Sequence, residues 1–144
     1  MAATRNRSSP APLRRMKMLV SGFVERPDYR VDLLPRRNRV TVQVGDQTVA
    51  SSNRTIVVDE QGHGLVFYFP PVDVDFDRLV AIDQRTTFCP FKGIARYLAA
   101  STAPELPIAW AYADPFVQVA ALAGYIAFYQ DRAIITVGGE DPIG

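Results

Sequence analysis

The close spacing of strand-like segments constrains the fold of this chain more than any other sequence feature. In the segment 40–44, valine alternates with Thr41 and Gln43, and a period of two is typical of a half-buried strand. Gly45 and Asp46 then supply a turn, and residues 47–50 return as the second half of a β-hairpin. Further strand-like runs cover residues 54–58, 65–69, 93–100, 108–112 and 133–137. Connections this short hold no crossover helices, so the sequence predicts a mainly β domain built on a compact antiparallel sheet of about eight strands.

One segment near the C-terminus, residues 114–124, breaks the strand pattern and predicts a helix. Asp114 is a suitable N-cap, and Pro115 fits the first helical position because that position needs no backbone N–H. Gly124 is a suitable stop for the helix. The segment holds too many apolar residues for a surface helix, so we expect one C-terminal helix packed on the sheet.

The charge is unevenly distributed along the chain. Five of the 16 basic residues lie within residues 1–17, which hold no acid, and this leaves 11 basic residues beside all 15 acidic ones in the rest of the chain. We therefore expect a flexible basic tail over residues 1–27 and a single β-rich domain over residues 28–144. A mildly acidic domain is a poor match for nucleic acid, so nucleic acid is not an expected partner.

The composition also excludes several classes of protein. No apolar run approaches the roughly 20 residues that a membrane helix needs, and KMLVSGFV is too short for a secretory signal. We therefore expect a cytoplasmic protein with no membrane partner.

Metal sites are also not expected. One cysteine and one histidine supply neither an internal disulfide nor the ligands of a multi-cysteine or histidine-rich site. In VDVDFD, residues 72–77, three aspartates alternate with apolar residues, which predicts a strand with a solvated acidic face. A cation on this face would need further oxygen ligands from loops, and none are evident nearby. We expect no metal and no other cofactor.

The segment TTFCPFKG, residues 86–93, holds the only cysteine of the chain and one of its two lysines. The thiolate is the reactive form of cysteine, and the ammonium of Lys92 three positions away would favour it. Cys89 is thus a candidate catalytic nucleophile or redox thiol, with His63 as the one histidine that could serve as its base. The alternative, which the sequence favours, is that Cys89 is a small buried hydrophobe in a turn.

Lys92 also has two interpretations, and the sequence favours neither. Lysine is rare here, since 14 of the 16 basic residues are arginine, and several aromatic residues lie near Lys92 in the sequence. Its ammonium would suit a pocket for an anionic or planar ligand. The alternative is a surface cation paired with an aspartate. Trp110 and Tyr112 would face the same side of a strand, either in the core or in the wall of such a pocket.

The segment TFCPFKGIARY, from Thr87 to Tyr97, resembles the signature of domain-of-unknown-function family 427. The hairpin RVTVQVGDQTVASS, the segment FYFPPVDV, and the pair AWAYADP and GYIAFY agree with that family in order, from about Tyr29 to Val137. The resemblance implies a compact Mss4-like or β-tent fold and brings with it a nucleotidyltransferase-like label. The chain has no glycine-rich phosphate loop, and no Gly-Ser followed by paired strand carboxylates for magnesium. Zinc-bearing relatives of this architecture use paired Cys-x-x-Cys motifs, which the single Cys89 does not supply.

The sequence therefore predicts a small-molecule binding module with an aromatic-lined concavity. Lys92 would anchor an anionic or planar ligand by its charge, so that Lys92→Met should leave the stability nearly unchanged. The other residues expected to line the site are Thr87, Cys89, Tyr97, Trp110 and Tyr112. Two alternatives stay open: an enzyme, using Cys89 or the activity in the family label, and a scaffold or interaction domain. The identity of the ligand and the oligomeric state also stay open.

Overall fold

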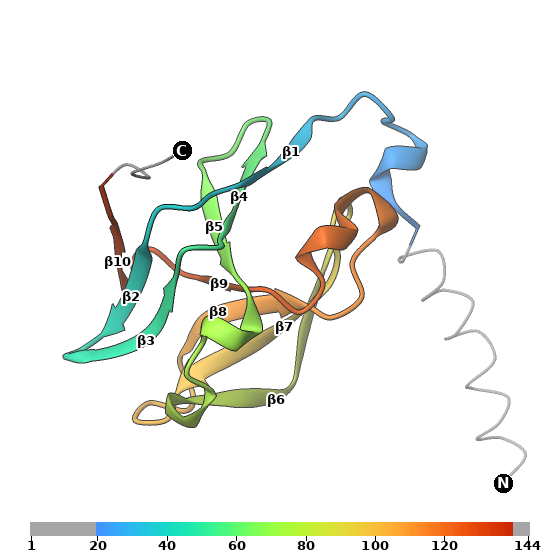
Figure 1. Cartoon of the computed structure of the whole chain (residues 1–144). Helices are drawn as coiled ribbons and strands as arrows, with labels where there is room; N and C mark the ends of the chain where they lie inside the picture. Colours follow the sequence, from blue (N-terminus) through green and yellow to red (C-terminus); the bar gives the residue numbers. More distant parts are fainter. Residues whose placement is uncertain (1–19, 140–144) are drawn as a thin grey trace, which may run out of the picture.

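The computed structural model describes residues 20–139, which form two antiparallel sheets joined by loops and short 3-10 turns (Figure 1). The larger sheet has seven strands in the order β1-β4-β5-β9-β8-β7-β6, and the smaller has three in the order β10-β2-β3. In the larger sheet the strands are β1 (Val31–Pro35), β4 (Ile56–Glu60), β5 (Val66–Phe69), β6 (Leu79–Cys89), β7 (Gly93–Ala100), β8 (Pro107–Tyr112) and β9 (Ile126–Phe128). In the smaller sheet they are β2 (Val40–Val44), β3 (Gln47–Ser52) and β10 (Ile134–Val137). The prediction of a mainly β, antiparallel fold is confirmed.

The smaller sheet forms around the predicted hairpin. Val40 and Val42 of β2 are fully buried, whereas Gln43 is exposed. The β2–β3 turn contains Gly45, whose φ of 62° lies in the left-handed region that glycine adopts without strain. Strand β10 pairs with the other edge of β2, which brings the C-terminal part of the chain to the hairpin.

The segment around Cys89 forms the turn between β6 and β7. Cys89 and Gly93 are paired residues at the ends of the two strands, and the Lys92 N–H donates to the Cys89 carbonyl at 3.2 Å. Gly93 has a φ of 120°, which residues with a Cβ rarely adopt. The prediction of a turn at this point is confirmed, although most of the preceding long strand β6 was not predicted.

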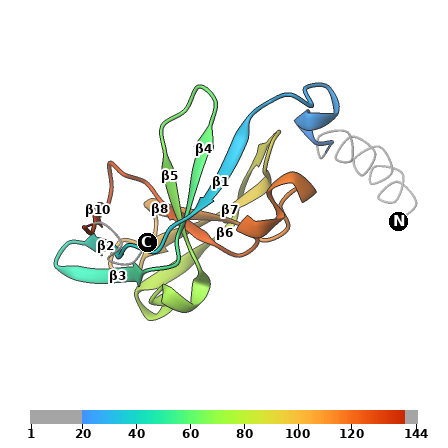
Figure 2. The same ribbon diagram turned by 45° about the horizontal axis from the view of Figure 1, so that its top comes forward.

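Successive residues along the strands of the larger sheet face two different buried clusters. In β9, Ile126 and Phe128 belong to a buried cluster that also contains residues of the smaller sheet, whereas Ala127 belongs to a second cluster on the opposite face. In β5, Phe69 and Tyr68 divide in the same way. We call these the inner face and the outer face of the larger sheet. Figures 1 and 2 show β2, β3 and β10 grouped on one side of the molecule, with the β6–β7 turn on the other.

The predicted C-terminal helix is wrong. The segment instead contains a 3-10 turn, η4 (Val117–Leu122), which is interrupted at Val119, where φ is −127° and ψ is 30°. Val119 and Leu122 are buried in the cluster on the outer face, so the expected packing against the sheet does occur. A 3-10 turn makes this contact in place of a regular α-helix. Across residues 20–139, no helix is long and apolar enough to cross a membrane.

Hydrogen bonds to the sheet explain why this segment does not form a regular helix. The N–H of Phe116 donates to the Lys92 carbonyl, and the N–H of Gly124 donates to the Tyr112 carbonyl, both at 3.0 Å. These bonds hold the segment at one end against the β6–β7 turn and at the other end against β8, and the chain between them forms bonds of the 3-10 type, from i to i−3. Gly124 does end the segment, with a φ of 76°.

The strand predicted over residues 72–77 is also wrong. Two 3-10 turns take its place, η2 (Pro71–Asp73) and η3 (Phe76–Arg78). The carboxylate of Asp75 accepts a hydrogen bond from the Asp77 N–H at 3.1 Å. Short acidic side chains compete with a strand ladder for backbone N–H groups in this way, so alternation alone was a misleading signal.

The basic tail predicted over residues 1–27 lies mostly outside the described residues, which begin at Val20. Within residues 20–27, the turn η1 (Gly22–Val24) is capped by Ser21, whose hydroxyl accepts from the Phe23 N–H at 3.1 Å. The Gly22 N–H donates to the Pro90 carbonyl at 2.6 Å, which joins this part of the chain to the β6–β7 turn.

Candidate functional site

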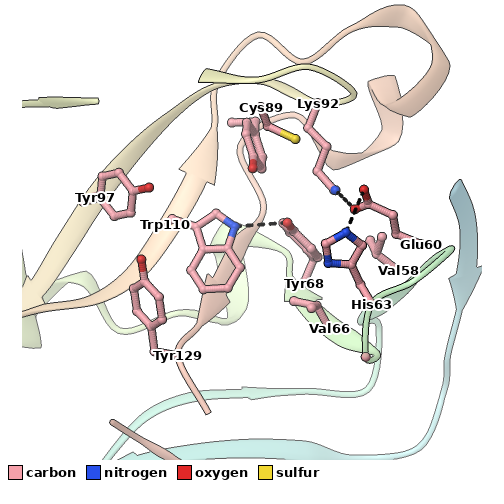
Figure 3. A pocket seen from close by; sticks show the side chains of 12 residues that line it. Val58, Glu60, His63, Val66, Tyr68, Cys89, Lys92, Tyr97, Trp110 and Tyr129 are labelled. Atoms are coloured by element: carbon pink, nitrogen blue, oxygen red, sulfur yellow. Dashed lines mark hydrogen bonds and ion pairs between the residues drawn. The ribbon is translucent and has the colours of Figure 1, made fainter. Parts of the chain in front are cut away.

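A cavity of about 290 Å³ opens on the outer face of the larger sheet (Figure 3). Strands β4 and β5 contribute to one wall, β7 and β8 to another, and the β6–β7 turn to one end. We call this cavity the pocket. Five of the six residues that the sequence predicts for a binding site line it: Cys89, Lys92, Tyr97, Trp110 and Tyr112. The sixth, Thr87, does not line the pocket, but its hydroxyl lies 2.6 Å from the Tyr97 hydroxyl.

Strand alternation brings the aromatic side chains of the pocket together. Trp110 and Tyr112 both come from β8, and Tyr97 of β7 is the cross-strand partner of Trp110. From β5, the Tyr68 hydroxyl accepts a hydrogen bond from Trp110 Nε1 at 3.1 Å, and the two rings meet edge to face with centroids 6.3 Å apart. Burial raises the pKa of Tyr68 and of Tyr112, so both hydroxyls are protonated at neutral pH.

A buried ion pair forms the polar end of the pocket. Lys92 and Glu60 are 7% and 9% exposed, and Nζ of Lys92 donates to Oε1 of Glu60. The Tyr29 hydroxyl donates to the other carboxylate oxygen at 2.6 Å, and Nε2 of His63 lies 3.6 Å from that oxygen. Burial disfavours the charged form of Glu60. The hydrogen bonds from Lys92 and Tyr29 and the charge of Lys92 outweigh this effect and hold the pKa of Glu60 below its ordinary value.

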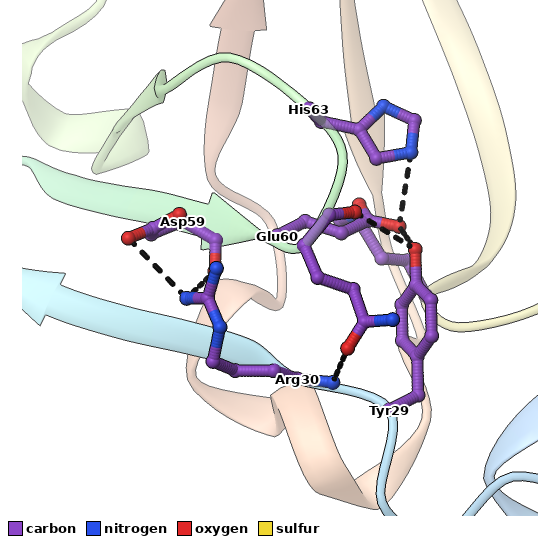
Figure 4. A network of polar contacts seen from close by, with 7 residues as sticks. Tyr29, Arg30, Asp59, Glu60 and His63 are labelled. Atoms are coloured by element: carbon purple, nitrogen blue, oxygen red, sulfur yellow. Dashed lines mark hydrogen bonds and ion pairs between the residues drawn. The ribbon is translucent and has the colours of Figure 1, made fainter.

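The segment 21–30, which we call the strap, holds Tyr29 against the pocket. Figure 4 shows the Tyr29 hydroxyl reaching the Glu60 carboxylate. The Tyr29 ring stacks on Phe91 with centroids 3.7 Å apart, and Phe23 meets Phe91 edge to face at 5.0 Å. The hydrogen bond to Glu60, with a smaller contribution from burial, raises the pKa of Tyr29 to about 12. The strap therefore fixes the orientation of Glu60 and, through it, that of Lys92.

The burial of Lys92 settles part of the ambiguity that the sequence left. The surface interpretation, with an aspartate as the partner, is wrong, because the side chain is buried and its partner is Glu60. The expectation that Lys92→Met leaves the stability nearly unchanged rested on an exposed or unpaired ammonium. Removing one partner of a buried pair leaves the other charge uncompensated, so a clear loss of stability is now expected.

Comparison with known protein families adds the identity of the domain. A family model described as a domain of unknown function, DUF427, matches residues 32–139. The chain belongs to the DUF427 family. The resemblance carried by TFCPFKGIARY is thereby confirmed, and no curated protein matches the chain. Every residue that lines the pocket falls within the DUF427 match, whereas Tyr29 and the rest of the strap precede it.

Sequence reasoning missed two important groups in this DUF427 site, Glu60 and Tyr29. A signal for Glu60 exists, because it follows the buried residues Val57 and Val58 and shares a strand face with Val58. A carboxylate on a buried strand face needs a partner, and Lys92 was available. No comparable signal marks Tyr29, because its contact with Glu60 spans 31 positions and two elements that do not adjoin in the sequence.

Cys89 and His63 line the same pocket, which the sequence could not establish. Cys89 is half-buried and forms no disulfide, and His63 stands in a loop between Gly62 and Gly64 with its Nε2 near Glu60. Within residues 20–139, no group of three or more cysteine, histidine or acidic side chains is arranged to hold a metal ion. The site therefore offers a thiol, an imidazole, an ammonium and aromatic hydroxyls around one cavity.

Proposed function

We propose that this DUF427 chain is a small-molecule binding module that takes a planar, oxygen-bearing ring into the pocket. The observation that carries the proposal is the meeting of aromatic walls and a buried ammonium at a single cavity. Binding pockets are typically concave and mostly apolar, with a few polar groups that fix the orientation of the ligand. At about 290 Å³, this pocket is near the lower end of the usual size range and suits a ligand of one or two rings.

The hydrogen-bonding capacity of the ion pair favours a ligand that accepts hydrogen bonds. An ammonium has three donors, and within the described residues the side chain of Lys92 makes one hydrogen bond, to Glu60. The Glu60 oxygens already receive Lys92 and Tyr29, with His63 close by. The polar end of the pocket therefore offers unused donors and few acceptors. A carbonyl oxygen on the ring would satisfy them.

The pairing with Glu60 also bears on the charge of the ligand. Since the carboxylate neutralises the ammonium, the polar end carries no net charge from these two groups. Of the anionic and planar ligands that the sequence left open, the neutral planar ring fits this balance better. An anion would gain from Lys92, but repulsion from Glu60 would offset part of that gain.

Matched ligand pairs test the proposal in the wild-type protein. Trp110 is the only tryptophan of the chain and lines the pocket, so its fluorescence reports binding there. We expect hypoxanthine and uracil to change this fluorescence and to bind at least about tenfold more tightly than purine and pyrimidine, which lack the carbonyl groups. If all four bind equally or none binds, the proposal fails. Lys92→Met, if folded, should bind hypoxanthine no better than purine.

A second candidate function is an enzyme that uses Cys89 as a nucleophile or redox thiol. It is favoured by the shared pocket, since His63 could accept the thiol proton and Glu60 could orient the imidazole. This function predicts that iodoacetamide alkylates Cys89 at pH 7 faster than it alkylates free cysteine. His63→Ala should slow the reaction. Slow labelling that becomes fast only in denaturant would exclude the enzyme and leave the binding module.

We also propose the detailed architecture and the cellular location that the sequence predicts. The Mss4-like or β-tent architecture that the resemblance implies is supported by the antiparallel sheets, and superposition on a solved structure of that architecture would test it. The expected cytoplasmic location would be tested by fractionating cells that produce the full chain. Recovery in a membrane or secreted fraction would contradict it.

A further inference from the structure

A second cavity adjoins the pocket, and we propose that it binds a hydroxyl-bearing substituent on the ring, so that the full ligand is a neutral nucleoside-like molecule. This inference rests on the proposed function and extends it. The second cavity has a volume of about 380 Å³. The two cavities share the lining residues His63, Gly64, Val66, Trp110 and Tyr129. We call the second cavity the side cavity.

The shared wall makes the two cavities neighbours across the same aromatic rings. Trp110 and Tyr129 lie with ring centroids 4.9 Å apart and line both cavities. Leu65 and Gln130 line the side cavity but not the pocket. Gln130 Nε2 donates a hydrogen bond to the Leu65 carbonyl at 3.0 Å. Because Trp110 and Tyr129 line both cavities, a substituent on a ring held in the pocket could extend past Trp110 into the side cavity.

The polar groups of the side cavity favour a hydrogen-bond donor as the substituent. Asp131 lines the cavity, and within residues 20–139 no side-chain hydrogen bond or ion pair involves its carboxylate. A hydroxyl group would donate to this carboxylate, and hydrogen bonds to charged groups are among the stronger ones in proteins. Leu65 and Val66 add apolar contact for the carbon atoms of such a substituent.

The same groups disfavour a phosphate. The nearest arginine in the sequence, Arg132, is already engaged, because its guanidinium lies over the Tyr129 ring at 4.7 Å and donates to the Pro107 carbonyl at 2.7 Å. His63 is paired with Glu60. A phosphate on the substituent would meet the Asp131 carboxylate, and among the described residues that line the side cavity there is no arginine or lysine to offset the repulsion. The geometry therefore points to a nucleoside-like ligand and away from a nucleotide.

Two series of probes test this inference, each titrated into the wild-type chain with Trp110 fluorescence as the signal. The series are uracil, uridine and uridine monophosphate, and hypoxanthine, inosine and inosine monophosphate. In at least one series we expect the nucleoside to bind about tenfold more tightly than the base, because it gains a charge-assisted hydrogen bond. The monophosphate should bind more weakly than the nucleoside, and this difference should shrink at high salt.

A pair of matched variants identifies the group responsible. Asp131→Asn should remove most of the preference for nucleoside over base and most of the penalty for the phosphate, while binding of the base itself stays unchanged. Asp83→Asn is the control, because Asp83 is also exposed but lies on β6 away from both cavities. It should change none of the affinities.

The outcomes separate this inference from the proposed function. If the bases bind and the nucleosides bind no more tightly, the side cavity is not a subsite, although the proposed function stands. If a monophosphate binds as tightly as its nucleoside, the inference about the Asp131 carboxylate is overturned. If no base and no nucleoside binds, both the proposed function and the inference are overturned.

Discussion

The inner and outer faces of the larger sheet are built by the same strands, yet they are filled in different ways. In β5, Phe69 on the inner face packs edge to face against Phe128 with centroids 5.7 Å apart. Its neighbour Tyr68, on the outer face, carries one additional hydroxyl and bonds it to Trp110. The smaller sheet packs on the inner face, whereas on the outer face the described residues provide only the short turn η4 and, beside Glu60, the strap. Where the cover is short, aromatic residues with polar tips line an opening.

This difference predicts that the two faces respond to different kinds of substitution. The inner face is an apolar core, in which the cost of a change follows the volume that is removed. The outer face holds an ion pair and several hydroxyls away from water, and such groups destabilise the fold when a partner is lost. The inner face should therefore be sensitive to the size of side chains and the outer face to their pairing.

The largest expected effect is on the inner face. Phe69→Ala should lower the free energy of unfolding by about 3–5 kcal/mol, because Phe69 is fully buried and its ring would leave a cavity between the two sheets. Urea denaturation followed by far-UV circular dichroism would measure the loss. Phe69→Leu is the matched control and should cost about 1–2 kcal/mol, since it keeps most of the volume. Equal effects of the two variants would show that the inner face is not tightly packed.

The next largest loss of stability is expected when the ion pair on the outer face is broken. Lys92→Met keeps most of the volume of the side chain and removes its charge, so on the inner face such a change would be mild. Here we expect a loss of about 3 kcal/mol, because Glu60 would be left charged and buried without its main partner. The double variant Lys92→Met with Glu60→Gln should recover part of the loss in the same denaturation assay. A loss below about 0.5 kcal/mol for the single variant would mean that Lys92 behaves as a surface residue.

The sequence predicted the hairpin of the smaller sheet better than the strand order of the larger sheet for a physical reason. A hairpin such as β2–β3 depends on alternation and on a turn at Gly45, and both signals are local. The pairing of β1 with β4 and of β5 with β9 joins segments far apart in the chain, and no local pattern specifies it. The class of fold was therefore predictable, whereas the order of the strands was not.

The candidate site shows the same division between local and long-range signals. The spacing of Trp110 and Tyr112 predicted that both would face one side, and the TFCPFKG turn drew attention to Lys92. The partner of Lys92 was not found, because Glu60 lies 32 positions away. The failed helix after Asp114 has a similar origin. Its capping signals were present, but the hydrogen bonds to the β6–β7 turn and to β8 that replaced the helix come from the tertiary fold.

A smaller effect tests how far the strap supports the outer face. Tyr29→Phe removes the hydroxyl that donates to Glu60 and keeps the stacking on Phe91. We expect the free energy of unfolding to fall by about 1.5 kcal/mol at pH 7, the lower end of values for hydrogen bonds to charged groups. Phe23→Leu, which changes the strap without touching Glu60, is the control for general loosening of this segment.

The pH dependence of Tyr29→Phe provides a second measurement. The pKa of Tyr29 is raised from 10.0 to about 12 in the folded state, so the folded protein holds this proton where the unfolded chain releases it. The stabilisation by Tyr29 should be fully present below pH 10 and should be lost as the pH rises through about 12. The difference in stability between wild type and Tyr29→Phe should therefore shrink over this range. A difference that stays constant up to pH 12 would show that the hydroxyl does not donate to Glu60.

The smallest expected effect concerns Thr87, the one predicted site residue that does not line the pocket. Its hydroxyl bonds to the Tyr97 hydroxyl on the exposed side of the outer face, where water competes for both groups. Thr87→Val should therefore cost only about 0.5 kcal/mol, and part of that is offset by the strand preference of valine. Thr86→Val is the matched control, being exposed on the same strand with no side-chain hydrogen bond among the described residues. If Thr87→Val costs as much stability as Tyr29→Phe, the position of Tyr97 depends on this contact. The part of the outer face that depends on paired polar groups would then extend beyond the pocket to β6.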